Sequence, residues 1–322
     1  MNKTEKANIQ VRDTIIELME KHGSDWARSW TSANPVLSRN AATGRIYKEF
    51  YNQLILGEVM AQTRQNCPYW NTYNGWQKLG YQVIDKAYGA YIHRTFPKYE
   101  KDAETGEDSK NIAYFASNTF PVYNGAHVKQ ATFEEVKTKR GGTRLVATLL
   151  DDAKTYAELN PLPPVSKPQG AEVIALVEKY IANTGAEVRH GSDGAFFHPT
   201  GDYISMPTRE SFHSTEAYYA VLLHELTHWT GHKSRLDRLK STKWGDSLYS
   251  FEELIAELGS AFLCNSLGIS STPRPDHAKY LNGWIKNLKN DAKGIIEASR
   301  EAQKAFELLE SFQPNNQLEE AA

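Results

Sequence analysis

The sequence lacks long apolar runs and is poor in cysteine. Its longest apolar run, which contains YYAVLL at residues 218–223, is far shorter than the ~20 residues that a membrane-spanning helix needs. The amino-terminal segment carries charges throughout and has no apolar stretch of the kind found in a signal peptide. Cys67 and Cys264 lie too far apart to form a metal-binding or redox motif. We therefore expect a cytoplasmic protein with reduced cysteines and no membrane partner.

An excess of one charge is also absent from the chain as a whole. Its 322 residues carry a formal net charge of −2, and the 24% charged and 40% hydrophobic residues are typical of a globular protein. The two halves differ, because residues 1–150 hold 20 Lys and Arg against 15 Asp and Glu, whereas residues 151–322 hold 17 against 24. The basic half favours a polyanionic partner, and a solvated basic face is the alternative.

A proline-rich segment separates these halves. Four prolines fall within PLPPVSKPQG at residues 161–170, a composition that continues neither a helix nor a strand ladder. A chain of 322 residues also suits two domains of ordinary size. We therefore predict an α+β protein of two domains, at residues 1–150 and 171–322, joined by an extended linker at 151–170.

Aromatic residues are concentrated in the first half, after an amphipathic helix predicted at residues 8–22. Twelve of the 56 residues from Gly44 to Tyr99 are aromatic, about twice the 11% of the whole chain, and seven Lys and Arg lie among them. Rings stack on unpaired bases while cationic side chains follow the phosphates, so this composition favours single-stranded nucleic acid as a partner. The alternative is an aromatic core. The candidate contacts are Arg45, Tyr47, Trp70, Tyr73, Trp76, Lys78 and Arg94.

The most specific motif lies in STEAYYAVLLHELTHWTG at residues 214–231. The segment begins with a serine cap and ends with Gly231, which predicts one helix. His224 and His228 are four residues apart, so both imidazoles lie on one face and can reach a single ion. Glu225 follows the first histidine and is the candidate general base. This H-E-x-x-H pattern predicts a Zn²⁺ site, and another divalent ion such as Mn²⁺ is the alternative.

A catalytic zinc takes three protein ligands, so the motif requires a third. A second helix is predicted in SFEELIAELGSAFL at residues 250–263, where Glu253 and Glu257 share a face. Glu253 is the first candidate, although a helix capping box also explains it. Glu257 is assigned a hydrogen bond to a ligand histidine. His232 and Glu257 are the alternative third ligands, and Glu252 lies one position off the shared face.

Short strands are predicted just before the metal-binding helix. The segments EVRH, AFFH and YISMP, at residues 187–190, 195–198 and 203–207, have strand composition, and PTGD between the last two suits a hairpin. An edge strand above the metal-binding helix would bind an extended peptide by strand addition. The second domain is therefore predicted to combine a small sheet with the metal site.

Ordered segments in both halves resemble a known family. In the first half they are NPVLSRNAATGRIYKEFYN, CPYWNTYNGWQKLGYQV and FPVYN; in the second, NTGAEVRHG, YISMP, EAYYAVLLHELTHWTGH, KWGDSLYSFEELIAELGSAFLC and DHAKYLNGWIKNLKNDAKGI. Over nearly its whole length the chain is thereby similar to the ArdC-like antirestriction proteins of plasmids and phages. These proteins pair an amino-terminal domain that binds single-stranded DNA with a carboxy-terminal zincin-like metallopeptidase domain. Glu49 and Phe50 depart from the family, which has smaller residues there.

The resemblance implies both a site and a function. His224, His228 and Glu253 would be the metal ligands, and Glu225 the general base. The protein would bind single-stranded DNA and protect incoming plasmid or phage DNA from restriction. A protein of the host restriction or DNA-processing machinery would be the peptidase substrate. The rival hypothesis is a non-catalytic DNA shield in which the metal only stabilises the second domain.

Overall fold

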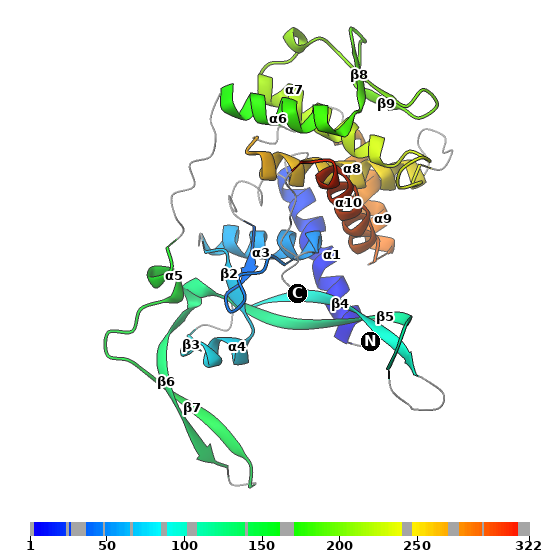
Figure 1. Cartoon of the computed structure of the whole chain (residues 1–322). Helices are drawn as coiled ribbons and strands as arrows, with labels where there is room; N and C mark the ends of the chain where they lie inside the picture. Colours follow the sequence, from blue (N-terminus) through cyan, green and yellow to red (C-terminus); the bar gives the residue numbers. More distant parts are fainter. Residues whose placement is uncertain are drawn as a thin grey trace. The chain divides into compact units, whose positions relative to one another are not determined.

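The chain folds into two compact units of mixed helices and strands (Figure 1), which confirms the predicted two-domain α+β class. Residues 1–11 and 36–163 form the first unit, and residues 12–35 and 164–322 form the second. The computed structural model describes residues 3–23, 26, 37–47, 49–64, 67–84, 89–101, 108–138, 141–161, 171–239, 247–269, 277–291 and 293–314. In this part of the chain, no helix combines the length and the apolar composition needed to cross a membrane.

The first unit contains a four-stranded sheet in the order β1–β2–β5–β4. Strands β4 (Gly89–Lys101) and β5 (Asp108–Asn124) form a long antiparallel hairpin. Strand β2 (Tyr69–Asn71) pairs antiparallel with β5, and β1 (Arg39–Asn40) pairs parallel with β2. Helix α3 (Phe50–Thr63) packs against β4. Their shared core contains Leu56, Met60, Trp70, Ala90, Ile92 and Val122.

Two side-chain amides of α3 hold this helix in place. The Asn52 amide donates to the backbone carbonyl of His93 over 2.8 Å and accepts from the same residue's N–H over 2.9 Å. The Gln53 amide pairs in the same way with the backbone of Ser38, over 2.9 and 2.7 Å. All four residues are buried. Each amide therefore takes the place of a strand neighbour and satisfies backbone groups that would be costly to bury unpaired.

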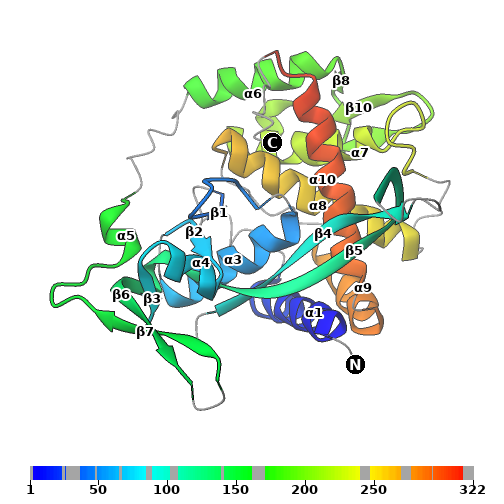
Figure 2. The ribbon, with the colours of Figure 1, turned by 60° about the horizontal axis from the view of Figure 1, so that its bottom comes forward.

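A second, three-stranded sheet of the first unit has the order β3–β6–β7. Its strands are β3 (Tyr81–Val83), β6 (Val128–Lys137) and β7 (Thr143–Leu149), and β6 and β7 form a hairpin (Figure 2). The short helices α4 (Tyr73–Lys78) and α5 (Tyr156–Leu159) and the 3-10 helix η2 (Gly125–His127) lie beside it. Its core contains Trp76, Val83 and Val128.

The segment expected to be a linker begins with ordered structure. Helix α5, within residues 151–170, starts with a complete capping box between Thr155 and Glu158. The Tyr156 ring lies 4.9 Å from the Trp76 ring, so α5 packs onto the core of the first unit. Residues 162–170, which include most of the proline-rich run, lie outside the described residues. The predicted boundaries at 150 and 171 remain predictions.

The second unit begins with part of helix α1 (Lys3–His22), which includes the helix predicted at residues 8–22. Its sheet has the order β8–β10–β9, with β8 (Glu187–His190) parallel and β9 (Phe196–His198) antiparallel to β10 (Tyr203–Met206). These three strands were predicted from the sequence, and β9 is an edge strand. The 3-10 helix η3 and helix α6 have the bounds Arg209–Ser211 and Ala171–Thr184.

Helices α7 (Thr215–Thr230) and α8 (Ser247–Leu267) pack against each other, and Ser214 caps α7 as predicted by accepting the Ala217 N–H over 3.1 Å. A Cβ on Gly259 of α8 would lie 2.5 Å from Cγ2 of Thr227 on α7, so glycine permits this close approach. Helix α10 runs alongside α8 (Figure 2). The last two helices are α9 (His277–Asn290) and α10 (Gly294–Ser311).

Candidate functional site

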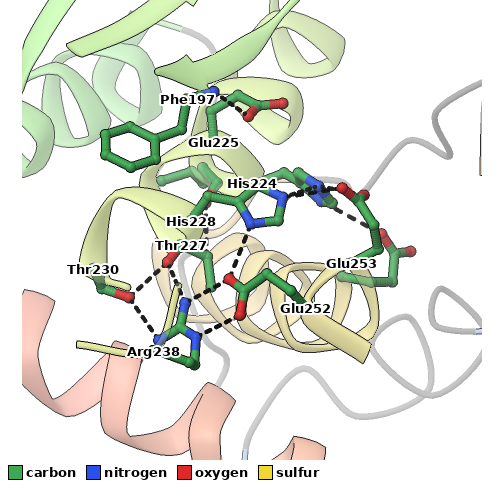
Figure 3. Close-up of polar contacts among 11 residues, drawn as sticks. Phe197, His224, Glu225, Thr227, His228, Thr230, Arg238, Glu252 and Glu253 are labelled. Atoms are coloured by element: carbon green, nitrogen blue, oxygen red, sulfur yellow. Dashed lines mark hydrogen bonds and ion pairs between the residues drawn. The ribbon is translucent and has the colours of Figure 1, made fainter. Parts of the chain in front are cut away.

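His224, His228 and Glu253 come together where α7 packs against α8 (Figure 3). The two histidine Nε2 atoms are 3.2 Å apart. Oε2 of Glu253 lies 3.4 Å from His224 Nε2, and its Oε1 lies 3.5 Å from His228 Nε2. All three side chains are buried. The structure therefore brings together the two histidines of the motif and the glutamate expected as the third ligand.

The spacing of these donor atoms suits a metal ion. Metal–ligand bonds of about 2.0–2.1 Å in a tetrahedral site place the ligand atoms roughly 3.3 Å apart. The two histidine Nε2 atoms, 3.2 Å apart, match that value, and each carboxylate oxygen of Glu253 lies at a similar distance, 3.4 or 3.5 Å, from one of these nitrogens. Two imidazole nitrogens and one carboxylate are also a donor set that zinc and related divalent ions accept. His224, His228 and Glu253 thus fit the metal that H-E-x-x-H predicts.

The electrostatics of the site favour a positive charge. Burial lowers the pKa of His228, but the hydrogen bonds and charges of Glu252 and Glu253 outweigh burial and raise this pKa to about 10. Burial raises the pKa of Glu253, but the hydrogen bonds and charges of His224 and His228 outweigh burial and hold it far below its usual value. The carboxylates therefore stabilise a cation at the imidazoles, and a divalent ion would replace a proton there.

Glu252, not Glu257, makes the hydrogen bond to a candidate ligand histidine. Its Oε1 accepts from Nδ1 of His228 over 3.0 Å. Glu257 lies beside the other histidine, but its Oε2 is 3.8 Å from Nδ1 of His224, beyond hydrogen-bond distance. Glu252 lies one position off the face predicted from the sequence. Its contact depends on how α8 is rotated against α7, which helical spacing alone does not determine.

Arg238 is a further residue of the site that the sequence did not single out. Its guanidinium donates to both carboxylate oxygens of Glu252, over 2.7 and 2.8 Å (Figure 3). Arg238 lies in the segment after α7, ten residues beyond the second histidine, with no motif to mark it. Only the fold of that segment back along the helix brings it to the site.

Glu225 lies on α7 directly after the first motif histidine and is only 2% exposed. Its Oε2 accepts the backbone N–H of Phe197 over 2.9 Å (Figure 3). Phe197 belongs to β9, one of the two edge strands of the small sheet. The candidate base therefore contacts the backbone of an edge strand.

His232, an alternative third ligand, is engaged elsewhere. Its Nδ1 lies 2.7 Å from Oγ of Ser234 and 3.6 Å from Oδ2 of Asp202. It does not belong to the candidate metal-binding group found among the described residues, which has Glu253 as its third member. Helix α7 ends at Thr230, so His232 has left the helical repeat that aligns His224 with His228.

The predicted nucleic-acid contacts of the first unit divide by exposure. Trp70 and Trp76 are both 0% exposed, and a ring with no exposed face cannot stack on a base, so these two assignments are corrected to core residues. Tyr47 is partly buried, its hydroxyl donates to the Trp70 carbonyl over 3.2 Å, and burial raises its pKa to about 12. Of the other predicted contacts, the cations Arg45, Lys78 and Arg94 are exposed, and Tyr73 is partly exposed.

Tyr73 belongs to a larger group of partly exposed tyrosines around the buried Trp76. The ring of Tyr73 lies 6.3 Å from that of Tyr123. The rings of Tyr81 and Tyr156 lie 5.3 Å apart, and both contact Trp76. We call Tyr73, Tyr81, Tyr123 and Tyr156 the tyrosine group. Composition indicated aromatic enrichment, but Tyr123 and Tyr156 lie outside the enriched stretch and join it only in the fold.

Two family descriptions match this chain. Residues 5–123 match the N-terminal domain of the anti-restriction factor ArdC. Residues 175–301, which include α7 and α8, match a zincin-like metallopeptidase. The two matches fall on the two parts of the chain to which the sequence assigned different tasks, and a zincin-like domain implies a metal.

Related proteins match over nearly the whole chain. The protein y4eC of Sinorhizobium fredii is 29% identical over 97% of this chain and 94% of its own length. The DNA primase TraC of Escherichia coli is 31% identical over 94% of this chain. This chain spans only 27% of that primase, so the match concerns one part of the larger protein.

Solved structures of the antirestriction protein ArdC from plasmid R388 are also similar. The Mn(II)-bound structure is 31% identical with a TM-score of 0.69, over 96% of this chain and 99% of ArdC. The metal-free structure is 32% identical with a TM-score of 0.68, over 94% and 96%. Since sequence and fold agree over the full length of both proteins, this chain belongs to the ArdC family of antirestriction proteins, with an ArdC amino-terminal domain and a zincin-like domain.

Proposed function

We propose that this chain is a cytoplasmic, single-stranded-DNA-binding antirestriction protein whose second unit is a divalent-metal peptidase. The observation that carries the peptidase proposal is the group of His224, His228 and Glu253, with Glu225 on the same helix. Two imidazoles and a carboxylate that converge beside a further buried carboxylate are the arrangement that metal-assisted hydrolysis of a peptide bond needs. Protection of incoming plasmid or phage DNA is the family activity to which this chemistry would contribute.

In this proposal His224, His228 and Glu253 hold the metal. A divalent ion, when bound, supplies Lewis acidity that polarises a carbonyl and makes water a stronger acid. The H-E-x-x-H pattern favours Zn²⁺, whereas the Mn(II)-bound structure of ArdC makes Mn²⁺ the second candidate. The chain's own residues fix the donor positions, because both histidines lie on α7 and Glu253 lies on α8.

Glu225 would accept the proton of the attacking water and return it to the leaving amine. The Phe197 N–H, which Glu225 accepts over 2.9 Å, helps to orient this carboxylate. Strand β9 is at the edge of its sheet and would bind the substrate chain in extended form. The substrate class is therefore an extended polypeptide, and we propose a protein of the host restriction or DNA-processing machinery.

The first unit would bind the DNA. Arg45, Lys78 and Arg94 are exposed cations that can follow phosphates, and the tyrosine group offers partly exposed rings for bases. The excess of basic over acidic residues in positions 1–150, 20 against 15, supports the same partner. The tyrosine group thus takes the stacking role that the sequence gave to Trp70 and Trp76.

A restriction assay in living cells tests the proposed function. Unmodified DNA is introduced into a restricting host that carries the wild-type protein or Glu225→Gln. We expect the wild type to protect the DNA and Glu225→Gln to lose protection while it keeps its fold, its metal and its affinity for single strands. Full protection by Glu225→Gln would instead favour the non-catalytic shield, in which the metal only stabilises the second unit.

A further inference from the structure

We propose that Arg238 and Glu252 form a positioning clamp for His228, which sets the affinity and coordination geometry of the metal site. This inference rests on the proposed metal function. Neither residue belongs to the three candidate ligands, and the H-E-x-x-H pattern requires neither of them. Both are positioning residues, because they act on the metal through His228.

The clamp is a chain of three hydrogen-bonded side chains. Glu252 Oε1 accepts from His228 Nδ1 over 3.0 Å and from Arg238 Nη2 over 2.8 Å. Glu252 Oε2 accepts from Arg238 Nε over 2.7 Å. The Arg238 and Glu252 side chains are only 7% and 12% exposed. A bidentate, nearly buried pair of this kind fixes the carboxylate in position and direction, which a flexible surface pair does not.

Arg238 is itself anchored to the metal-binding helix. Its Nη2 donates to the Thr227 carbonyl over 2.9 Å, and its Nη1 donates to Thr230 Oγ1 over 3.3 Å. Both acceptors lie in the last turn of α7, next to His228. Glu252 lies on α8 beside Glu253. The guanidinium therefore ties the helix that supplies two ligands to the helix that supplies the third.

Gly231 makes room for this arginine. Its φ of −78° is one that any residue adopts, so the glycine is not required for a left-handed turn. A Cβ at this position would lie 3.0 Å from Nη2 of Arg238 and 2.9 Å from Cγ of Leu239. The N–H groups of Arg238 and Leu239 both donate to the Gly231 carbonyl, over 2.9 and 3.0 Å, which brings the segment back over the helix end. Gly231 thus leaves room for the Arg238 side chain of the clamp.

The physical effect of the clamp is on the imidazole. A hydrogen bond at Nδ1 fixes the ring plane and leaves Nε2 as the donor atom toward the metal. His228 Nε2 is the atom that lies 3.2 Å from His224 Nε2. Without the clamp the His228 ring can rotate, so metal binding must also order this ring at a cost in conformational entropy. Loss of such a supporting partner typically lowers metal affinity about 10- to 100-fold.

Arg235 provides a matched control in the same segment. It too is a largely buried arginine that forms an ion pair, in this case with Asp202. Its guanidinium stacks over the Trp229 ring at 3.7 Å, and its Nε donates to the Trp229 carbonyl over 2.6 Å. Its described contacts include none of the three candidate ligands. Arg235→Met therefore removes a comparable charge and comparable packing without touching the clamp.

The test measures metal affinity on the full chain after its metal has been stripped. Dissociation constants for Mn²⁺ and Zn²⁺ are compared for wild type, Arg238→Met, Glu252→Gln and Arg235→Met, and visible absorption of bound Co²⁺ reports coordination geometry. We expect the first two variants to lose about 10- to 100-fold in affinity and to change the Co²⁺ spectrum. Combining them should add little, because both act through one hydrogen bond. Arg235→Met should bind like wild type.

Gly231→Ala keeps the test decisive where the charge variants fold poorly. It removes no charge, and its Cβ would press on both the Arg238 guanidinium, 3.0 Å from Nη2, and the Leu239 side chain, 2.9 Å from Cγ. We expect it to weaken metal binding as Arg238→Met does, and Arg238→Lys to restore part of the affinity. Affinities within twofold of wild type in Gly231→Ala and Arg238→Met, or an equal loss in Arg235→Met, would overturn the clamp alone. A wild-type protein that binds no divalent ion would overturn the proposed metal function and the clamp together.

Discussion

The carboxylate of Glu225 accepts a hydrogen bond from the backbone N–H of Phe197 over 2.9 Å. This contact joins α7, which carries both motif histidines, to β9, the edge strand of the small sheet. The candidate base and the candidate peptide-binding edge are thus fixed relative to each other. A substrate held on β9 would therefore meet a carboxylate that is already oriented.

Replacing Glu225 with glutamine should separate catalysis from metal binding. The amide oxygen of Gln can still accept the Phe197 N–H, but it cannot take up a proton at neutral pH. We expect hydrolysis of a fluorogenic casein to fall by about 10²- to 10⁴-fold, with an unchanged metal dissociation constant. Glu216→Gln, an exposed change on the same helix, is the control and should keep full activity. Activity of Glu225→Gln within twofold of wild type would remove Glu225 from the mechanism.

The stability of the metal-free protein should depend on Glu252 in a pH-dependent way. Burial raises the pKa of Glu252, but the hydrogen bonds and charges of Arg238 and His228 outweigh burial and hold it below its usual 4.5. A carboxyl with a lowered folded pKa stabilises the fold above its unfolded pKa, and this contribution is lost as pH falls through the folded value. At pH 7, Glu252→Gln should cost about 3–5 kcal/mol, because it leaves Arg238 buried beside an uncharged partner.

Chemical denaturation in the presence of a chelator, between pH 3 and 7, measures this effect. The difference in unfolding free energy between wild type and Glu252→Gln should be largest between pH 4.5 and 6.5, the usual pKa values of Glu252 and His228, because Glu252 also raises the pKa of His228. It should narrow at lower pH, where the wild-type carboxyl becomes protonated. A difference that stays constant down to pH 3 would show that the charge of Glu252 contributes nothing to the fold.

Single-stranded DNA binding should depend on exposed cations of the first unit. Arg45→Ala and Arg94→Ala each remove one exposed charge. We expect each to weaken binding and to reduce the slope of log affinity against log salt by about 0.7, the value for one phosphate contact on a single strand. Fluorescence anisotropy of a labelled oligonucleotide at several salt concentrations measures both. Lys179→Ala, an exposed change on α6, is the control, and equal losses in all three variants would contradict a specific surface.

Asn52 should be a stability residue and not a DNA contact. Its amide pairs with the backbone N–H and carbonyl of His93, and both residues are buried. Asn52→Ala leaves these groups unpaired and should lower the unfolding free energy by about 1–3 kcal/mol for each group. Asn74→Ala, an exposed change on α4, should leave stability within about 0.5 kcal/mol. A stable Asn52→Ala that has lost DNA binding would reverse this assignment.

Helical spacing alone predicts the part of the metal site that lies on one helix. His224 and His228 are one turn apart on any helix, so their convergence needs no tertiary information. The glutamates of α8 differ, because the rotation of α8 against α7 decides which one faces the histidines. That rotation depends on the close approach of Gly259 to Thr227. Spacing ranked Glu253 first among the third-ligand candidates, and Glu253 is the glutamate that the structure places with both histidines. Spacing could not assign the His228 contact to Glu252.

The individual DNA contacts of the first unit could not be predicted from composition. Aromatic enrichment is the same signal whether the rings face solvent or a core, and Trp70 and Trp76 prove to be core residues. The tyrosine group includes Tyr156, which lies more than fifty residues beyond the enriched stretch, in a segment expected to be a linker. The class of partner could therefore be predicted from composition, but not the individual contacts.

The proposed peptidase requires a divalent-metal site made by His224, His228 and Glu253. Its most direct test is metal binding to stripped protein, measured by equilibrium dialysis and elemental analysis with Mn²⁺ and Zn²⁺. We expect about one ion per chain in wild type and in Glu225→Gln. His228→Ala and Glu253→Ala should each lose at least about 100-fold in metal affinity, because each removes one of the three ligands. Wild-type protein that binds neither ion, or a Glu253→Ala variant that binds as tightly as wild type, would contradict it.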